Sequence, residues 1–276
     1  MMLNLTSITT NLEQRADGIW YACNQSPIDY PEEGNAFCFR VEEGSFWFNH
    51  RNSFILEALR RLPPGQPLFD IGGGNGFVAK ASCEAGIETV LVDPGIEGIL
   101  NARKRGINQL VCAALHDAGF LPGSLPAVGM FDVLDHIPDD LAFLKEIHSL
   151  LAPVGRLYLT VPAYQALWSI EDDFAQHYRR YRLNGLVERL QQSGFTVEFA
   201  TYIFITLPLP ILLFRTLPSK LGRRRHGDLE KIESELKPGS AGANSLLDFF
   251  LKLELHLLRR LNRLPFGGSC LVVALK

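Results

Sequence analysis

The stretch Pro67-Leu68-Phe69-Asp70-Ile71-Gly72-Gly73-Gly74-Asn75-Gly76 carries a short apolar run directly into a glycine-rich loop. The apolar run predicts a strand, and residues 77–85 after the loop predict a helix that Gly86 ends. A glycine loop between a strand and a helix lets the backbone approach a ligand closely. The first turn of the helix then offers unpaired N–H groups to a polar ligand. The loop therefore predicts a ligand site at the end of a strand.

The spacing of the glycines narrows the class of ligand. Asp70, Gly72, Gly74 and Gly76 follow the pattern Asp-x-Gly-x-Gly-x-Gly. A dinucleotide-binding loop would need its last glycine where Phe77 stands. The Lys-Ser/Thr pair of a phosphate-binding loop is also missing, so neither a dinucleotide nor a nucleoside triphosphate is favoured.

Two acidic residues frame the loop. Asp70 comes directly before it, where a carboxylate suits a ligand ammonium group better than a pyrophosphate. Asp93 ends the next predicted strand, residues 89–92, where a carboxylate can accept hydrogen bonds from both ribose hydroxyls. A ligand with an aminoacyl group and a ribose matches both carboxylates. The alternative is a tight turn beside a solvated Asp.

The rest of the pattern predicts an α/β fold. Strands are expected at 109–113, 127–131 and 156–161, with helices at 97–105 and 140–151 between them. This alternation indicates a mostly parallel sheet with helices on both faces. The predicted units are a cap segment (1–48), a core (49–202), a helical insert (203–264) and a last core strand (265–276). Within these, strands are expected at 195–202 and 269–275 and helices at 183–190 and 245–264.

Composition excludes some functions. The net charge of −3 gives no basic footprint, so we expect no nucleic-acid partner. Five cysteines without a Cys-x-x-Cys pair indicate reduced thiols and a cytoplasmic protein. Cys23 and Cys38 lack further ligands at metal-binding spacing, so no metal is predicted. The first residues show no basic start followed by an apolar run, so no signal peptide is expected.

Three further segments carry a resemblance to a known family. After the fourth predicted strand the chain reads Phe131-Asp132-Val133-Leu134-Asp135-His136-Ile137. With the glycine loop, this resembles the class I S-adenosylmethionine-dependent methyltransferases, in the bacterial small-molecule branch with type 11 or type 12 domains, where the phrase typically ends in Glu-His. The segments Phe46-Trp47-Phe48-Asn49-His50-Arg51 and 167–181 resemble a subgroup met beside polysaccharide and lipid biosynthesis.

The resemblance implies a fold, an activity and a cofactor. The fold is a Rossmann-like sheet of seven strands with the last strand antiparallel, here with the insert before that strand. The activity is methyl transfer from S-adenosylmethionine, with S-adenosylhomocysteine as product (EC 2.1.1.-). The loop and the resemblance together imply these cofactor-binding residues: Asp70, Gly72, Gly74, Asn75, Gly76, Asp93, Pro94, Leu115, Asp132 and Arg51.

One position departs from the family pattern. The family commonly has an acidic residue after the third strand that reaches the adenine amino group. Here Ala113 and Ala114 stand there. Either Asp117 substitutes, or backbone groups and apolar packing around Leu115 hold the adenine.

Methyl transfer from a sulfonium is an in-line displacement, so alignment and exclusion of water supply much of the catalysis. Oxygen or nitrogen acceptors often also need a base, for which histidine is well matched. The candidate catalytic residues are His136, His177 and Tyr181. The alternatives are a helix cap for His136 and a surface histidine for His177.

Four residues are candidates for acceptor binding: Trp47, Trp168, Arg179 and Arg180. Arginine binds carboxylates and phosphates in a bidentate way, which favours an acidic or phosphorylated acceptor. The alternative is that the arginines pair internally with the acidic run 171–173.

The sequence of the insert is compatible with several roles. Its first part, 203–217, is too short and too rich in proline for a spanning helix, which needs ~20 apolar residues. The later helix is amphipathic. A lid, a homodimer interface or a peripheral contact at the inner membrane face, with basic residues 223–225 near lipid head groups, all fit. The acceptor is accordingly a small molecule or a lipid- or saccharide-linked intermediate. The competing function is a non-catalytic module that binds the cofactor and acts through the insert.

Overall fold

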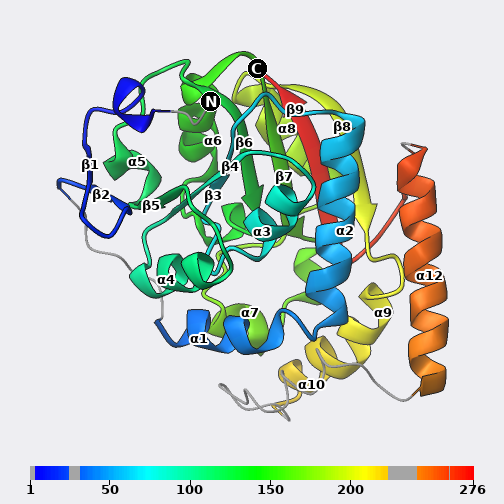
Figure 1. Cartoon of the computed structure of the whole chain (residues 1–276). Coiled ribbons are helices and arrows are strands. Elements are labelled where there is room, and N and C mark those ends of the chain that lie inside the picture. Colours follow the sequence, from blue (N-terminus) through cyan, green and yellow to red (C-terminus); the bar gives the residue numbers. More distant parts are fainter. Residues whose placement is uncertain (1–3, 25–31, 223–240, 261) are drawn as a thin grey trace.

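The computed structural model describes residues 4–24, 32–222, 241–260 and 262–276, and its centre is one mixed sheet (Figure 1). The strand order is β1-β2-β5-β4-β3-β6-β7-β9-β8. The strands are β1 Leu12–Gln14, β2 Trp20–Ala22, β3 Leu68–Ile71, β4 Thr89–Asp93, β5 Leu110–Cys112, β6 Leu125–Phe131, β7 Leu151–Pro162, β8 Thr196–Ile203 and β9 Ser269–Leu275.

The predicted α/β fold is confirmed. Strands β5, β4, β3, β6 and β7 pair in parallel, and β9 pairs antiparallel with both β7 and β8. These seven strands are the expected Rossmann-like sheet with an antiparallel last strand. The central strands β3, β4 and β5 are buried along their whole length, as apolar strands covered on both faces must be.

Helices cover both faces of the sheet. One face packs against α5 (Leu115–Ala118), α6 (Asp140–Leu150) and α8 (Leu183–Gln192). The other packs against α2 (Phe46–Arg61), α3 (Phe77–Glu84), α4 (Ile96–Lys104) and α12 (Ala241–Arg259). The short elements are η1 Leu5–Ser7, η2 Leu134–His136, η3 Gln165–Leu167 and α7 Ile170–Phe174.

The N-terminal region contains structure that the sequence did not predict. Strand β2 pairs in parallel with β5, and β1 pairs with β2, so a hairpin extends the sheet beyond the expected seven strands. Helix α1 (Glu32–Val41) lies against α4. Helix α2 begins at Phe46, because the Ser45 side chain caps it by accepting a hydrogen bond from the Phe48 N–H.

The insert lies between β8 and β9 and is helical, as predicted. Helix α9 (Pro208–Ile211), the π-helical turn η4 (Leu212–Thr216) and α10 (Leu217–Lys220) follow one another directly, and α12 comes after them. The basic run 223–225 and the linker 237–240 fall outside the described residues. Among the described helices, none combines the length and the apolar character needed to cross a bilayer.

Candidate functional site

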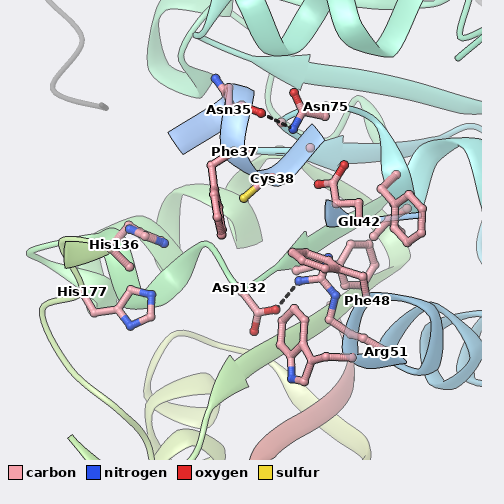
Figure 2. Close-up of a pocket in the computed structure, with 18 of the residues that line it drawn as sticks. Asn35, Phe37, Cys38, Glu42, Phe48, Arg51, Asn75, Asp132, His136 and His177 are labelled. Carbon is pink, nitrogen blue, oxygen red and sulfur yellow. Dashed lines mark hydrogen bonds and ion pairs between the residues drawn. The ribbon is translucent and has the colours of Figure 1, made fainter. Parts of the chain in front are cut away.

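Two adjoining cavities open over the carboxyl ends of the central parallel strands, where open α/β sheets place their ligands. Their volumes are about 350 and 290 Å³. Both are lined by Asn35, Gly72, Gly74, Asp132 and His136, so they form one continuous cleft. We call them the first and the second cavity; Figure 2 shows residues that line the first.

The glycine loop forms one wall of the cleft and is held by Asp93. The Gly74 N–H donates to Asp93 Oδ2 and the Gly95 N–H donates to Asp93 Oδ1, both at 2.8 Å. Gly72, Gly74 and Gly76 all have positive φ. At Gly76 a Cβ atom would also lie 2.7 Å from the Ala102 Cβ, so only glycine fits there.

Asp70 supplies an unsatisfied carboxylate at the floor of the first cavity. It is 2% exposed, and its Oδ2 atom has no hydrogen-bond partner among the described residues. Burial raises the pKa of this carboxyl to about 7, and nearby Arg51 counteracts the rise only partly. A buried carboxylate without a donor is costly, and a ligand ammonium group would complete it. This atom therefore fits the aminoacyl end of S-adenosylmethionine.

The second cavity fits a nucleoside. Asp93 lies in its lining, and each of its oxygens accepts one backbone hydrogen bond and retains capacity for another. Predicted cofactor residues Pro94 and Leu115 line the same cavity. The remaining walls are largely apolar, with Val92, Ala113, Ala114, Val133, Ile137 and Phe143 among them.

Arg51 and Asp132 lie side by side in the lining of the first cavity (Figure 2). The Arg51 guanidinium forms a short ion pair with the Asp132 carboxylate. The same guanidinium lies 4.8 Å from the Trp47 ring centroid and 5.2 Å from that of Phe48. The predicted residues Arg51, Asp132 and Trp47 are thus brought to one wall, with Phe48 added.

Helix α1 covers the cleft and was missed by the sequence analysis. Its Asn35, Phe37 and Cys38 line the first cavity, together with Glu42 just after it. The Asn75 side chain donates to the Asn35 carbonyl at 2.9 Å. Arg105 donates to Glu42 Oε2 at 2.6 Å and to the Asn75 carbonyl at 2.9 Å, which ties α1 to the loop. The spacing of Phe37 and Val41, four residues apart, was the available signal for this helix.

The two candidate histidines meet on the side of the first cavity away from Arg51 (Figure 2). Their ring centroids are 4.7 Å apart, at 81°. His177 lies between two carboxylates: its Nδ1 is 3.0 Å from Asp172 Oδ1, and its Nε2 is 3.1 Å from Asp135 Oδ2. His136 Nε2 is 3.8 Å from the same Asp135 oxygen. The buried Asp135 was missed as a site residue, although it stands at the Glu position of the Glu-His phrase.

The electrostatics of the two histidines differ. Burial, and then the neighbouring His177, lowers the pKa of His136 to about 4. Burial also opposes the charged form of His177, but Asp172 and Asp135 outweigh it and raise the pKa. Burial raises the pKa of Asp135 to about 7. At neutral pH, His136 is therefore neutral, whereas Asp172 and Asp135 favour the protonated form of His177.

The same cluster is a set of possible cation ligands. Ligand atoms of Asp135, His136 and His177 all lie within 4.8 Å of one another. The sequence predicted no metal because Cys23 and Cys38 lack partners. That prediction did not consider these three residues, and it stays a prediction.

Five predicted site residues line neither cavity. One is Gly76, at the end of the glycine loop, and the other four have partners elsewhere. The Tyr181 hydroxyl lies 3.0 Å from Asp140 Oδ2 and 3.2 Å from the Leu134 carbonyl oxygen, and it can donate its single proton to either. The Trp168 indole N–H donates to Asp173. Arg179 pairs with Asp140 at 2.9 Å. Arg180 binds Asp172 in a bidentate way, through Nε at 2.7 Å and through NH2 at 2.9 Å. The arginines thus pair internally, which was the alternative interpretation of the basic patch, although Arg179 pairs outside the expected run 171–173.

Further residues that line the first cavity were not predicted as site residues. Among them are the aromatic side chains Phe48, Phe77, Phe131 and Phe174 and the charged side chains Glu171 and Arg215. They reach the first cavity from α2, α3, β6, α7 and η4. An aromatic wall of this kind favours a planar or apolar acceptor.

Comparisons with known proteins agree with this geometry. A family model described as "Methyltransferase domain" matches residues 47–199. The chain is 32% identical over 109 residues to a ubiquinone biosynthesis O-methyltransferase of Xanthomonas campestris, covering 37% of this chain and 46% of that protein. It is 26% identical over 102 residues to the Pseudomonas aeruginosa protein of the same name, covering 35% and 44%. The match thus spans less than half the length of these relatives.

Solved structures show the same fold. The phosphoethanolamine N-methyltransferase 2 of Haemonchus contortus, solved with S-adenosyl-L-methionine, has a TM-score of 0.55 at 21% identity, covering 89% of this chain and 57% of that one. A Haloferax volcanii methyltransferase, solved with the Trm112 activator, has a TM-score of 0.60 at 18% identity, covering 90% and 99%. At these identities the likeness concerns the fold alone.

Proposed function

The chain belongs to the class I S-adenosylmethionine-dependent methyltransferases, and from this premise we propose that it methylates a hydroxyl oxygen of a small acceptor bound in the first cavity. The family domain covers more than half of the chain. The observation that carries the proposal is the continuous cleft, which joins the second cavity, with Asp93 in its lining, to an aromatic cavity at Asp132 and His136.

The residues that would hold the cofactor divide between the two cavities. Asp70 would accept from the ammonium group, and Asp93 from the ribose hydroxyls. Backbone groups and apolar packing at Ala113 and Leu115 would hold the adenine, since no acidic side chain of the second cavity stands at the family's position. When bound, S-adenosylmethionine supplies an electrophilic methyl group.

The acceptor would lie in the first cavity, between the aromatic wall and the histidines. Trp47, Phe48 and Phe174 would contact an aromatic or apolar body and exclude water from it. The matched relatives are named as O-methyltransferases of ubiquinone biosynthesis, which supports a hydroxyl group on such a body. Lipid- or saccharide-linked hydroxyl compounds belong to the same chemical class.

His136 is the proposed general base. Its ring is neutral at pH 7, so it can take the acceptor hydroxyl proton while the oxygen forms its bond to the methyl carbon. Asp132, in the same lining, stabilises the resulting positive charge. His177 acts as a positioning residue, because it is held between Asp172 and Asp135.

The location that the sequence predicts is the cytoplasm. All five cysteines are unpaired in the structure, which supports a reducing compartment.

Mass spectrometry of small molecules and lipids retained by the purified protein is the first test. We expect S-adenosylmethionine or S-adenosylhomocysteine to be retained. Incubation with methyl-labelled S-adenosylmethionine and matched panels of phenols, catechols and amines then tests the acceptor. Label on hydroxyl compounds supports the proposal. Label on amines alone contradicts the O-methyl assignment, and cofactor binding without any product supports the non-catalytic module.

A further inference from the structure

A row of leucines on the insert faces away from the protein. Leu209, Leu213, Leu217 and Leu221 recur every fourth residue from α9 through η4 and α10 to the residue that caps α10. Side chains at this spacing share one face of a helical segment. Their exposed fractions are 62, 46, 42 and 65%. This leucine row is therefore a continuous apolar ridge on the surface.

The opposite side of the same segment holds its polar contacts. The buried Thr216 hydroxyl donates to the Leu167 carbonyl, and the Ser219 hydroxyl accepts from the Ile170 N–H. Arg215 lines the first cavity. A surface helix of a globular protein usually buries its apolar face and exposes its polar one. In this segment the polar side chains face the protein and the leucines face solvent. The same segment also forms part of the wall of the first cavity.

Helix α12 also exposes apolar side chains. Its inner side buries Leu251 and Leu258 against the core, whereas Phe249 is 61% exposed and Leu253 is 43% exposed. The buried Glu254 carboxylate accepts from the Phe204 N–H at 3.0 Å and from the Ile205 N–H. Since α9 begins at Pro208, this contact fixes α12 beside the start of the leucine row, and both lie on the same side of the molecule in Figure 1.

The charge of the insert sets it apart from the rest of the chain. Residues 203–268 contain eleven Lys and Arg but six Asp and Glu, in a protein whose net charge is −3. From 199 to 227 the sequence has five basic residues and no acidic one. The basic run 223–225 follows directly after the leucine row in the sequence. The apolar ridge thus belongs to the positively charged part of the chain.

We propose that the leucine row and the outer side of α12 form a docking surface for an anionic lipid bilayer. Apolar side chains would enter the boundary between head groups and acyl chains, and the exposed basic side chains Lys220, Lys252, Arg259 and Arg260 would bind anionic head groups. A surface attachment of this kind needs no spanning helix. A second copy of the chain fits less well, because a symmetric contact would bring two positively charged inserts against each other.

The docking surface deepens the proposed function and rests on it in one respect. Because Arg215 lines the first cavity from the same segment, an amphipathic hydroxyl compound could pass from the bilayer to the cavity without crossing bulk water. The acceptor would then be a lipid-soluble molecule rather than a freely diffusing one. The bilayer contact itself can be measured whether or not methyl transfer occurs.

Vesicle co-sedimentation of the full chain tests the surface. Wild-type protein is mixed with vesicles of phosphatidylcholine alone, or with a third of phosphatidylglycerol added. The test variant is L209S/L221S/F249S. The matched control is I96S/L121S/V154S, which replaces three exposed apolar residues (41, 40 and 74%) outside the insert. We expect wild type and control to bind anionic vesicles at least ~tenfold more tightly than the test variant, and more tightly than neutral vesicles.

Two readouts separate the possible failures. Titration with S-adenosylhomocysteine should give equal affinity for wild type and both triple variants, which shows that the cleft is intact. Wild-type protein that stays unbound at every lipid composition overturns the docking surface, as does an equal loss in the control. If light scattering instead shows a wild-type dimer that the test variant dissociates, the surface is a contact between copies. Absence of cofactor binding would overturn the proposed function but leave the vesicle result standing.

Discussion

The Nδ1 atom of His177 lies 3.0 Å from Oδ1 of Asp172. The same carboxylate accepts two hydrogen bonds from Arg180 and one from the Ser169 N–H. Although burial opposes its charge, His177 and Arg180 hold the pKa of Asp172 down to about 2. Asp172 is thus the point at which the predicted acceptor-binding arginine and the predicted catalytic histidine are joined.

The first prediction concerns the acid stability that Asp172 provides. Its folded pKa lies below the ordinary value of 3.8, so its contribution is present above about pH 4 and lost as the pH falls toward 2. We expect Asp172→Asn to lower the free energy of unfolding by about 2 kcal/mol at pH 5, and by little at pH 2. Urea unfolding across this range measures the difference. The exposed neighbour change Asp173→Asn should show no such trend, and a parallel trend would contradict the assignment.

The second prediction separates chemistry from binding at His136. Replacement by Gln should lower kcat by roughly 10² to 10⁴-fold, as loss of a general base does, with little change in affinity for S-adenosylhomocysteine. Since the pKa of His136 is lowered to about 4, the wild-type rate should stay level from pH 7 to about pH 5 and fall below that. His148→Gln, on α6, serves as control. An acid limb centred near the ordinary histidine value of 6.5 would assign the base to another group.

The third prediction is that replacing Asp70 raises the stability of the cofactor-free protein but weakens cofactor binding. Burial raises its folded pKa to about 7, so in the cofactor-free protein its ionisation costs stability progressively from about pH 4, and fully above pH 7. Asp70→Asn should therefore raise the free energy of unfolding at pH 8, by an amount on the order of 4 kcal/mol. The same change should weaken S-adenosylmethionine binding at least ~tenfold, because the ammonium group loses its counter-charge. Thermal unfolding and calorimetric titration of one preparation check both halves; unchanged affinity would remove Asp70 from the cofactor site.

The fourth prediction uses two glycines that differ only in their surroundings. Gly76 and Gly86 both have positive φ, at 75° and 83°. An added Cβ at Gly76 would lie 2.7 Å from the Ala102 Cβ, whereas at Gly86 nothing lies within 4 Å. Gly86→Ala should cost about 1 kcal/mol of stability from backbone strain alone, and Gly76→Ala roughly 2 to 4 kcal/mol because overpacking adds to the strain. Equal unfolding free energies for the two variants would show that α3 can move away from α4.

The sequence predicted the features whose information is local. Residues of the loop 70–75 and Asp93 line the cleft, because a strand followed by glycines and a helix encodes that turn in consecutive residues. The periodic apolar runs likewise predicted the strands of the core sheet. His136 and His177 were identified as candidates, and the structure brings their rings together.

Features that depend on contacts between residues far apart in the chain could not be predicted from local sequence patterns. A run of arginines does not show which carboxylates lie nearby, so Arg179 and Arg180 were assigned to a substrate although both pair internally. Helix α1 depends on Arg105 and Asn75, far away in the chain, for its place over the cleft. The β1–β2 hairpin has three-residue strands, which leave almost no periodicity to detect.

The position of β9 has a consequence for the order in which the chain folds. Strand β9 pairs with β7 on one side and with β8 on the other, although the whole insert separates it from β8 in sequence. Until β9 arrives, β7 and β8 each expose an unpaired edge, and such edges promote aggregation. On the ribosome, the sheet therefore stays incomplete while the insert is synthesised. The apolar, basic insert is thus synthesised while the edges of β7 and β8 are still unpaired.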